Sequence, residues 1–199
     1  MLYIFDMGGV VTSTCTIVPR LEKILGLGEG EFDRICGGEG HPGKADIFAM
    51  YSDGKIGAKE FWRLFGERSG IGVKTDWWHY LFHPVLNEGT VAIIKELRKK
   101  GNRVVCGTNT IESHYLNHME RGDYSYFDQT YASCLMGVSK PDLEFWKLIL
   151  FAEEENAENT VFIDDRKENC LGAESLGIRA IHFDGAENLS RKLGLDLIF

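Results

Sequence analysis

The chain opens on a short apolar run that ends in an aspartate and two glycines. Residues 2–5, Leu-Tyr-Ile-Phe, are too few for a helix but enough for a buried parallel strand. Asp6 follows this run, and ligands of open α/β sheets bind in the crevice beyond the carboxyl ends of the strands. Gly8 and Gly9 let the backbone turn sharply and approach a bound group closely. Asp and Gly are also ordinary turn residues, so this stretch alone leaves a simple turn open.

Predicted strands and helices alternate in the second half of the chain. Apolar runs at 103–106 and 160–163 predict strands, and residues 179–183 a further strand. The amphipathic segment 88–100 and the segment 142–151 predict helices between them. This alternation indicates an α/β fold with a doubly wound parallel sheet, of the Rossmann-like kind.

The segment between the first strand and this alternation is helical in pattern. Short helices are predicted at 18–27, 32–35, 47–51, 58–68 and 76–82, separated by glycine-containing turns. We therefore expect an α/β catalytic core of residues 1–12 and 87–199 and an inserted α-helical cap of residues 13–86. The aromatic residues of the cap have helical spacing and are expected to form its core. They are Phe48, Tyr51, Phe61, Trp62, Trp77 and Trp78.

The net charge and the composition limit the classes of possible binding partner. The net charge of −8 argues against nucleic acid or an anionic membrane as a partner. An anionic substrate would need a metal ion or a local positive site to approach. No basic segment precedes an apolar one at the amino terminus, and no run reaches the roughly 18 apolar residues that span a bilayer, so a cytoplasmic location is expected. The five scattered cysteines contain no C-x-x-C pair and predict neither a disulfide framework nor a zinc site.

Residues suited to chemistry follow three of the predicted strands. Asp6 follows the first, and Thr-Asn at 108–109 and Asp-Asp at 164–165 follow two others. Lys140 precedes Pro141, which restricts the lysine to an extended conformation. Each group alone has an ordinary explanation as a turn, a cap or a solvated lysine. Because the carboxyl ends of parallel strands meet at one edge, their shared location predicts a common site.

Such a site would suit phosphoryl transfer. Asp6 with Asp164 or Asp165 supplies oxygen ligands for Mg²⁺, which takes one or two carboxylates plus phosphate oxygens. Lys140 and Thr108 would hold the remaining phosphate oxygens. A carboxylate can act as the nucleophile through an aspartyl-phosphate, and the cations would offset its repulsion with the phosphate.

Four motifs resemble those of the haloacid dehalogenase superfamily of aspartyl-nucleophile hydrolases. The resemblance covers essentially the whole chain, and the inserted helices match the helical C1-type cap that closes over the site in many members. Within the superfamily the chain is most similar to bacterial sugar-phosphate phosphatases such as glucose-1-phosphate phosphatase, and to the N-terminal phosphatase domain of epoxide hydrolase. The motifs lie at 5–10, 104–109, 138–142 and 161–165, the last with Asn169.

The resemblance implies a role for each motif residue. Asp6 would be the nucleophile, and Mg²⁺ would be held by Asp6, the backbone carbonyl of Gly8 and Asp165, with Asp164 beside it. Thr108 and Lys140 would be catalytic as well as substrate-binding: Thr108 would bind the transferring phosphoryl group, and Lys140 would neutralise charge on it and on Asp6. Asn109 would also bind the substrate, and Asn169 would support the metal ligands.

Gly8 departs from the usual family pattern. Phosphatases of the superfamily usually carry a second Asp at this position as general acid, which is typically worth roughly 10²- to 10⁴-fold in rate. Its loss should slow alkyl leaving groups most. The glucose-1-phosphate branch resembles this chain in having Gly there, so phosphatase activity is not excluded, and a cap residue or a water could substitute. His41 and Lys44 in the glycine-rich cap loop are candidate substrate-binding residues, although loop residues of these types are more often solvated.

The expected function is a Mg²⁺-dependent phosphomonoester hydrolase for a small phosphorylated metabolite, such as a sugar phosphate. One alternative is a catalytically weak relative that binds a phosphorylated ligand or partner. Another is a haloacid dehalogenase, which would tolerate Gly8 but uses no Mg²⁺ and leaves Asp164 and Asp165 unexplained. The sequence does not predict the oligomeric state.

Overall fold

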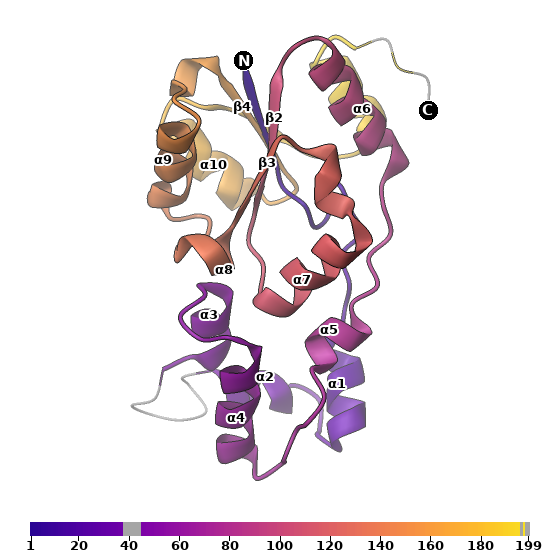
Figure 1. The fold of residues 1–199 in the computed structure, drawn as a ribbon, viewed down its shortest axis with the longest axis vertical. Helices are drawn as coiled ribbons and strands as arrows, with labels where there is room; N and C mark the ends of the chain where they lie inside the picture. The colour runs from indigo at the N-terminus through magenta and orange to yellow at the C-terminus, as the bar shows by residue number, and fades with distance from the viewer. Residues whose placement is uncertain (38–44, 196, 198–199) are drawn as a thin grey trace.

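The structure, a computed structural model, describes residues 1–37, 45–195 and 197 of the chain. In these residues five strands form one sheet in the order β3-β2-β1-β4-β5, with every neighbouring pair parallel (Figure 1). The prediction of a doubly wound parallel α/β fold is confirmed. The strands are β1 (Leu2–Phe5), β2 (Arg103–Thr108), β3 (Gln129–Ala132), β4 (Thr160–Asp164) and β5 (Arg179–His182).

The register of the central strands brings their carboxyl ends to one level. Phe5 of β1 lies opposite Cys106 of β2 and Ile163 of β4. Asp6 continues this alignment, since its backbone N–H donates to the Ile163 carbonyl at 2.9 Å. The residues that follow β1, β2 and β4 therefore share the edge where open α/β sheets bind ligands.

Strand β2 extends two residues beyond the predicted end at Cys106. Gly107 and Thr108 remain in the strand because they pair with Tyr131 and Ala132 of β3. Strand β3 itself has no counterpart among the predicted elements. It is a short, partly exposed strand at the sheet edge, so its sequence lacks the apolar run of the buried strands.

Helices cover both faces of the sheet, because successive side chains of a strand point to opposite faces. Tyr3 and Phe5 belong to a buried cluster that includes residues of α6 and α11, whereas Leu2 and Ile4 pack with residues of α9 and α10. The helices of this part are α6 (Glu88–Lys99), α7 (Glu112–Arg121), α8 (Ser133–Met136), α9 (Leu143–Ala152), α10 (Lys167–Ser175) and α11 (Ala186–Lys192), with the short 3₁₀ segments η1 (Asp123–Tyr126) and η2 (Ala157–Asn159).

The helices inserted after β1 have a hydrophobic cluster of their own. It contains Tyr51, Phe61, Trp62 and Trp78, as expected for the cap aromatics, while Trp77 is partly buried and Phe48 is 38% exposed. These helices are α1 (Val18–Leu25), α2 (Glu31–Cys36), α3 (Ile47–Ser52), α4 (Ala58–Ser69) and α5 (Trp77–Leu81).

The inserted helices join the sheet-containing part through two adjacent segments. Thr12 forms an isolated antiparallel bridge with Leu86, so the chain leaves and re-enters at one place. The division into a core of 1–12 and 87–199 and a cap of 13–86 stays a prediction, which this bridge and the separate cluster support. The same division is visible as the upper and lower parts of Figure 1.

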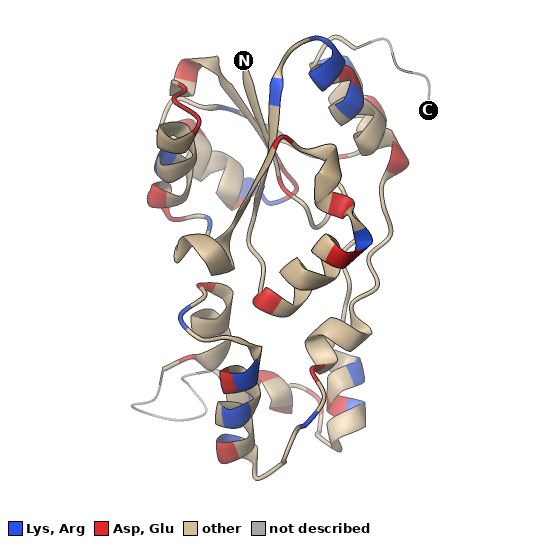
Figure 2. Cartoon of the chain, in the orientation of Figure 1, with Lys and Arg blue, Asp and Glu red and all other residues tan. Residues whose placement is uncertain are grey.

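Acidic and basic residues are interspersed along many of the helices of both parts, as the colours of Figure 2 show. Arg63 of α4, for example, pairs with Glu60 and Glu67 one turn away on either side. Among the described residues, no helix combines the length and apolarity that crossing a bilayer requires. All five cysteines carry free thiols.

Candidate active site

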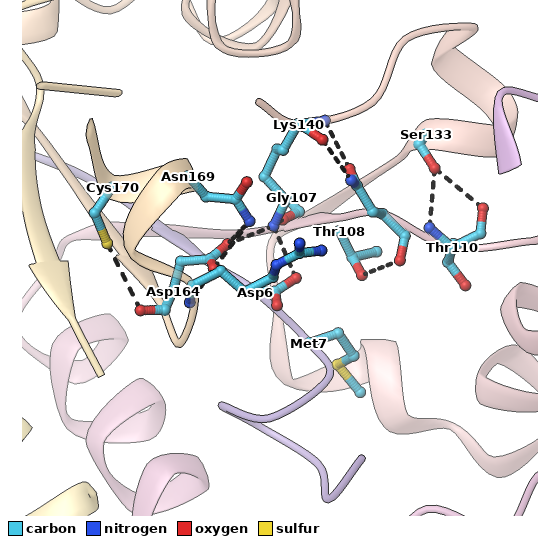
Figure 3. Close-up of polar contacts among 12 residues, drawn as sticks. Asp6, Met7, Gly107, Thr108, Thr110, Ser133, Lys140, Asp164, Asn169 and Cys170 are labelled. Atoms are coloured by element: carbon cyan, nitrogen blue, oxygen red, sulfur yellow. Dashed lines mark hydrogen bonds and ion pairs between the residues drawn. The ribbon is translucent and has the colours of Figure 1, made fainter. Parts of the chain in front are cut away.

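Asp6 lies at the centre of a buried polar cluster at the carboxyl edge of the sheet. The ammonium group of Lys140 donates to Asp6 Oδ1 at 2.9 Å, to Asp164 Oδ2 at 2.7 Å and to the Gly107 carbonyl at 2.9 Å (Figure 3). The three side chains come from distant parts of the sequence, and none is more than 8% exposed. The structure thus brings together three residues that the sequence placed in separate motifs.

Asn109 fixes the position of Lys140. Its Oδ1 accepts from the Lys140 backbone N–H, and its Nδ2 donates to the Lys140 carbonyl, both at 2.8 Å. The neighbouring Thr108 ends β2 and is buried beside the same edge. Both the oxygen and the nitrogen of the Asn109 amide thus bind the Lys140 backbone. These contacts position the lysine.

Asp164 is held by protein donors on both oxygens. Oδ2 accepts from Lys140, Oδ1 accepts from the Arg166 backbone N–H at 2.8 Å, and Asn169 Nδ2 lies 3.0 and 3.1 Å from the two oxygens. The resemblance implies that Asn169 supports the metal-binding residues. In the structure, Asn169 hydrogen-bonds to Asp164.

Three carboxylates are close enough together to share one divalent cation. Asp6, Asp164 and Asp165 each offer an oxygen within 4.8 Å of the others. Both oxygens of Asp164 already accept hydrogen bonds from protein donors. Asp6 and Asp165 are therefore the carboxylates better placed to bind an ion. Gly9 has φ of +83°, a conformation that favours glycine, and a Cβ there would lie 2.2 Å from Asp165 Oδ2, so a larger residue would displace this carboxylate. An all-oxygen donor set of this kind suits Mg²⁺.

The electrostatics of the cluster favour an added positive charge. Burial raises the pKa of Asp6 to about 6, with the adjacent Asp164 carboxylate adding to the rise and Lys140 opposing it. Burial and Asp164 likewise raise the pKa of Asp165. Burial lowers the pKa of Lys140, but the Asp6 and Asp164 carboxylates outweigh burial and raise it overall. One ammonium group thus faces three carboxylates, an excess of negative charge that a divalent cation would neutralise.

A pocket of about 200 Å³ opens beside the loop after β1. Gly8 borders it, and a Cβ at Gly8 would meet no atom within 4 Å. A larger hollow of about 390 Å³ lies at α7, η1 and β3, and neither the loop after β1 nor Thr108 or Asn109 lines it. The pocket beside Gly8 is lined by Met7, Gly8, Thr12, Ser13, Thr14, Cys15, Phe82, Thr108, Asn109, Thr110, His114 and His118.

Two histidines of this pocket were not predicted as site residues. His114 and His118 are four residues apart on α7, the helix that follows Thr108 and Asn109. Residues at this spacing lie on one helix face, so the spacing is a usable signal once the helix is recognised. The predicted substrate-binding residues His41 and Lys44 lie outside the described residues.

A buried lysine–carboxylate cluster at the carboxyl edge of a doubly wound sheet marks an enzyme of the open α/β class. The chain belongs to the haloacid dehalogenase-like hydrolase family, whose model matches residues 1–177. The predicted family is confirmed, and with it the prediction that the protein is a hydrolase.

The comparisons with individual proteins agree with this assignment. Sesquiterpene phosphatase astK of Aspergillus oryzae is 28% identical over 186 residues, which are 90% of this chain and 87% of that protein. Acyl-CoA dehydrogenase family member 10 of Mus musculus is 28% identical over 207 residues, covering 96% of this chain but 18% of that protein. A family enzyme of Bacteroides thetaiotaomicron, solved in complex with magnesium and inorganic phosphate, has a TM-score of 0.78 at 24% identity over 96% of this chain and 98% of that chain. This last likeness shows the shared fold.

Proposed function

We propose that the protein is a Mg²⁺-dependent phosphomonoester hydrolase that acts on a small phosphorylated metabolite. The observation that carries the proposal is the buried contact of Lys140 with Asp6, beside Asp165, at the carboxyl edge of the sheet. The relative named a sesquiterpene phosphatase and the solved relative that holds magnesium and phosphate support it.

In the proposed reaction, Asp6 attacks the phosphorus atom and forms an aspartyl-phosphate, which water then hydrolyses. Lys140 neutralises charge on Asp6 and on the transferring phosphoryl group, and Thr108 binds one of its oxygens. Mg²⁺, held by Asp6, Asp165 and the Gly8 carbonyl, would supply the remaining positive charge. We assign positioning roles to Asn109, which holds the Lys140 backbone, and to Asp164 with Asn169, which hold its ammonium group.

The pocket offers hydrogen-bonding groups to a leaving group. Its lining carries the hydroxyl groups of Ser13, Thr14 and Thr110, which can hydrogen-bond to the hydroxyl groups of a sugar. We therefore propose a hydroxylated substrate such as a sugar phosphate. The excess negative charge of the carboxylate cluster disfavours the haloacid reading, because a metal-free site with three carboxylates repels a carboxylate substrate.

Phosphate release from a panel of monoesters tests the proposal. The panel contains p-nitrophenyl phosphate, hexose phosphates and a farnesyl phosphate, each with Mg²⁺ or with EDTA. We expect release that needs Mg²⁺ and that is faster from a hexose phosphate than from farnesyl phosphate. If a folded protein that binds Mg²⁺ releases phosphate from none of them, the ligand-binding alternative replaces the hydrolase. Faster release from farnesyl phosphate would correct the substrate class alone.

A further inference from the structure

The pocket beside Gly8 contains two histidines that the proposed reaction does not yet use. His114 and His118 line it together with Gly8 and Thr108. Phe82 stacks on the His114 ring, with centroids 3.8 Å apart, and meets the His118 ring edge-on at 5.0 Å. Both imidazoles are therefore fixed in orientation in the wall of the pocket that Gly8 borders, and a Cβ at Gly8 would meet no atom within 4 Å.

His118 belongs to a buried histidine–carboxylate pair. Its Nδ1 lies 2.8 Å from Asp123 Oδ2, and both side chains are 4% exposed. Arg121 Nε donates to the same oxygen at 2.9 Å, so this oxygen acts as a hydrogen-bond acceptor. With an acceptor as its partner, Nδ1 carries the proton, and the lone pair of the neutral ring lies on Nε2. No described residue makes a hydrogen bond to this Nε2.

His114 is less suited to carrying a proton. Burial, together with the nearby His118 and His79, lowers its pKa to about 3. Its Nε2 is buried without a hydrogen-bond partner among the described residues, and no carboxylate contacts the ring. Burial also lowers the pKa of His118, but there the Asp123 contact opposes the effect, while Arg121 adds to it. Of the two imidazoles, His118 is thus the one whose protonated form has a partner.

We propose that His118, positioned by Asp123, is the acid–base residue of the hydrolysis, in place of the carboxylic acid that Gly8 lacks. This inference rests on the proposed phosphomonoester hydrolysis. In the first step, Asp6 forms its bond to phosphorus, the bond from phosphorus to the leaving oxygen breaks, and Nε2–H of the imidazolium gives that oxygen its proton. In the second step, water attacks phosphorus, Nε2 accepts the water proton, and the bond from phosphorus to Asp6 breaks. The products are the alcohol and phosphate, and His118 is again protonated.

Comparing substrates with different leaving groups distinguishes an acid–base role of His118 from a structural role. An aryl leaving group needs little protonation, whereas an alkyl leaving group needs a full proton. The parameter kcat/KM covers events up to the first irreversible step, the formation of the phosphoenzyme, so it isolates proton donation. We would measure kcat/KM for p-nitrophenyl phosphate and for glycerol phosphate with His118→Asn, whose amide nitrogen can replace Nδ1 as the donor to Asp123 but offers nothing at Nε2.

We expect His118→Asn to lower kcat/KM for glycerol phosphate by about 10²-fold or more and for p-nitrophenyl phosphate by less than about tenfold. Asp123→Asn removes the partner of the imidazolium, so the fall of glycerol phosphate kcat/KM with rising pH should begin at lower pH than in the wild type. His114→Asn is the matched control, because His114 lies one helical turn from His118 and lines the same pocket. It should change kcat/KM for both substrates by the same factor.

Equal losses on both substrates with His118→Asn, or no loss, would overturn the inference, as would an alkyl-selective loss with His114→Asn. An unchanged pH profile with Asp123→Asn would overturn the role of the pair. If His118→Asn does not fold, His118→Gln allows the same comparison of the two substrates. Its amide reaches the Nε2 position but cannot give up a proton. Wild-type protein that cleaves neither substrate would instead refute the proposed hydrolase, a result distinct from all of these.

Discussion

Lys140 joins the carboxylates of Asp6 and Asp164 through one buried ammonium group. A buried charge pair of this kind is costly to break, because the remaining partner is left uncompensated. The lysine cannot balance all three acids of the cluster, and burial leaves Asp6 with a pKa of about 6 in the absence of a metal ion. Protons and Mg²⁺ therefore compete for Asp6 in the physiological pH range.

This competition predicts that Mg²⁺ binding depends on pH. Below pH 6 the Asp6 carboxyl is protonated and must release a proton before it can bind the ion, so Kd should rise about tenfold for each unit that the pH falls. Above about pH 7 the group is ionised and Kd should level off. Titration calorimetry from pH 5 to 8, in two buffers of different ionisation enthalpy, measures both Kd and the released proton. A Kd that is the same at pH 5 and pH 7 would contradict the raised pKa of Asp6.

The residue types of the site could be predicted from the sequence, but their partners could not. Asp6, Lys140 and Asp164 stand in motifs at strand ends, and parallel strands place those ends together. The clamp of Asn109 on the Lys140 backbone depends on the loop geometry around Lys140, which no local pattern encodes. His118 was missed because its role depends on a helix whose packing against the pocket only the structure shows.

At the scale of elements, the turn after α3 connects the inserted helices to the site. Ser139, which precedes Lys140, donates to Asp53 Oδ1 at 2.6 Å. Ser133 Oγ donates to the Ser52 carbonyl at 2.9 Å. Gly54, the residue after Asp53, has φ of +66°, and a Cβ there would lie 1.8 Å from the Cys134 carbonyl oxygen. This close approach to α8 is possible only for glycine.

Two glycine substitutions separate backbone conformation from this close approach. Gly70 has a similar positive φ of +75°, but a Cβ there meets no atom within 4 Å. Gly70→Ala should cost about 1–2 kcal/mol from the left-handed conformation alone. Gly54→Ala should cost about 1–3 kcal/mol more, because the turn must move away from α8. Urea unfolding measures both variants, and equal midpoints would show that the contact with α8 is not tight.

The elements found by sequence are those with a strong apolar pattern. Strands β1, β2 and β4 were predicted because each carries an apolar run, and α6 because its buried residues follow a helical period. Strand β5 was predicted from its place in the strand–helix alternation, since its residues 179–182 include an arginine and a histidine. Strand β3 was missed because an edge strand with one partner needs few apolar residues. The helix α7 was missed because its buried face includes Ser113, Asn117 and His118 instead of a run of aliphatic residues.

On the scale of the whole molecule, two hydrophobic clusters cover the two faces of the sheet and a third holds the inserted helices together. Polar contacts connect the parts: Tyr51 of α3 hydrogen-bonds to Ser113 of α7, which also donates to Asp76. The pocket lies between the loop after β1, the linker residues near Thr12 and Phe82, and α7. The pocket thus lies where the inserted helices and the sheet-containing part meet, next to the loop that follows the candidate nucleophile Asp6.

The measurement that tests the central claim most directly is turnover of p-nitrophenyl phosphate by the wild type and by Asp6→Asn, with acid-quenched samples analysed by intact mass and peptide mapping. Asn retains the size of Asp but is a poor nucleophile and a weaker metal ligand. We expect that turnover needs Mg²⁺, that Asp6→Asn abolishes it, and that a phosphoryl adduct found during turnover maps to the peptide containing Asp6. Turnover that survives in Asp6→Asn, or an adduct on another residue, would show that Asp6 is not the nucleophile.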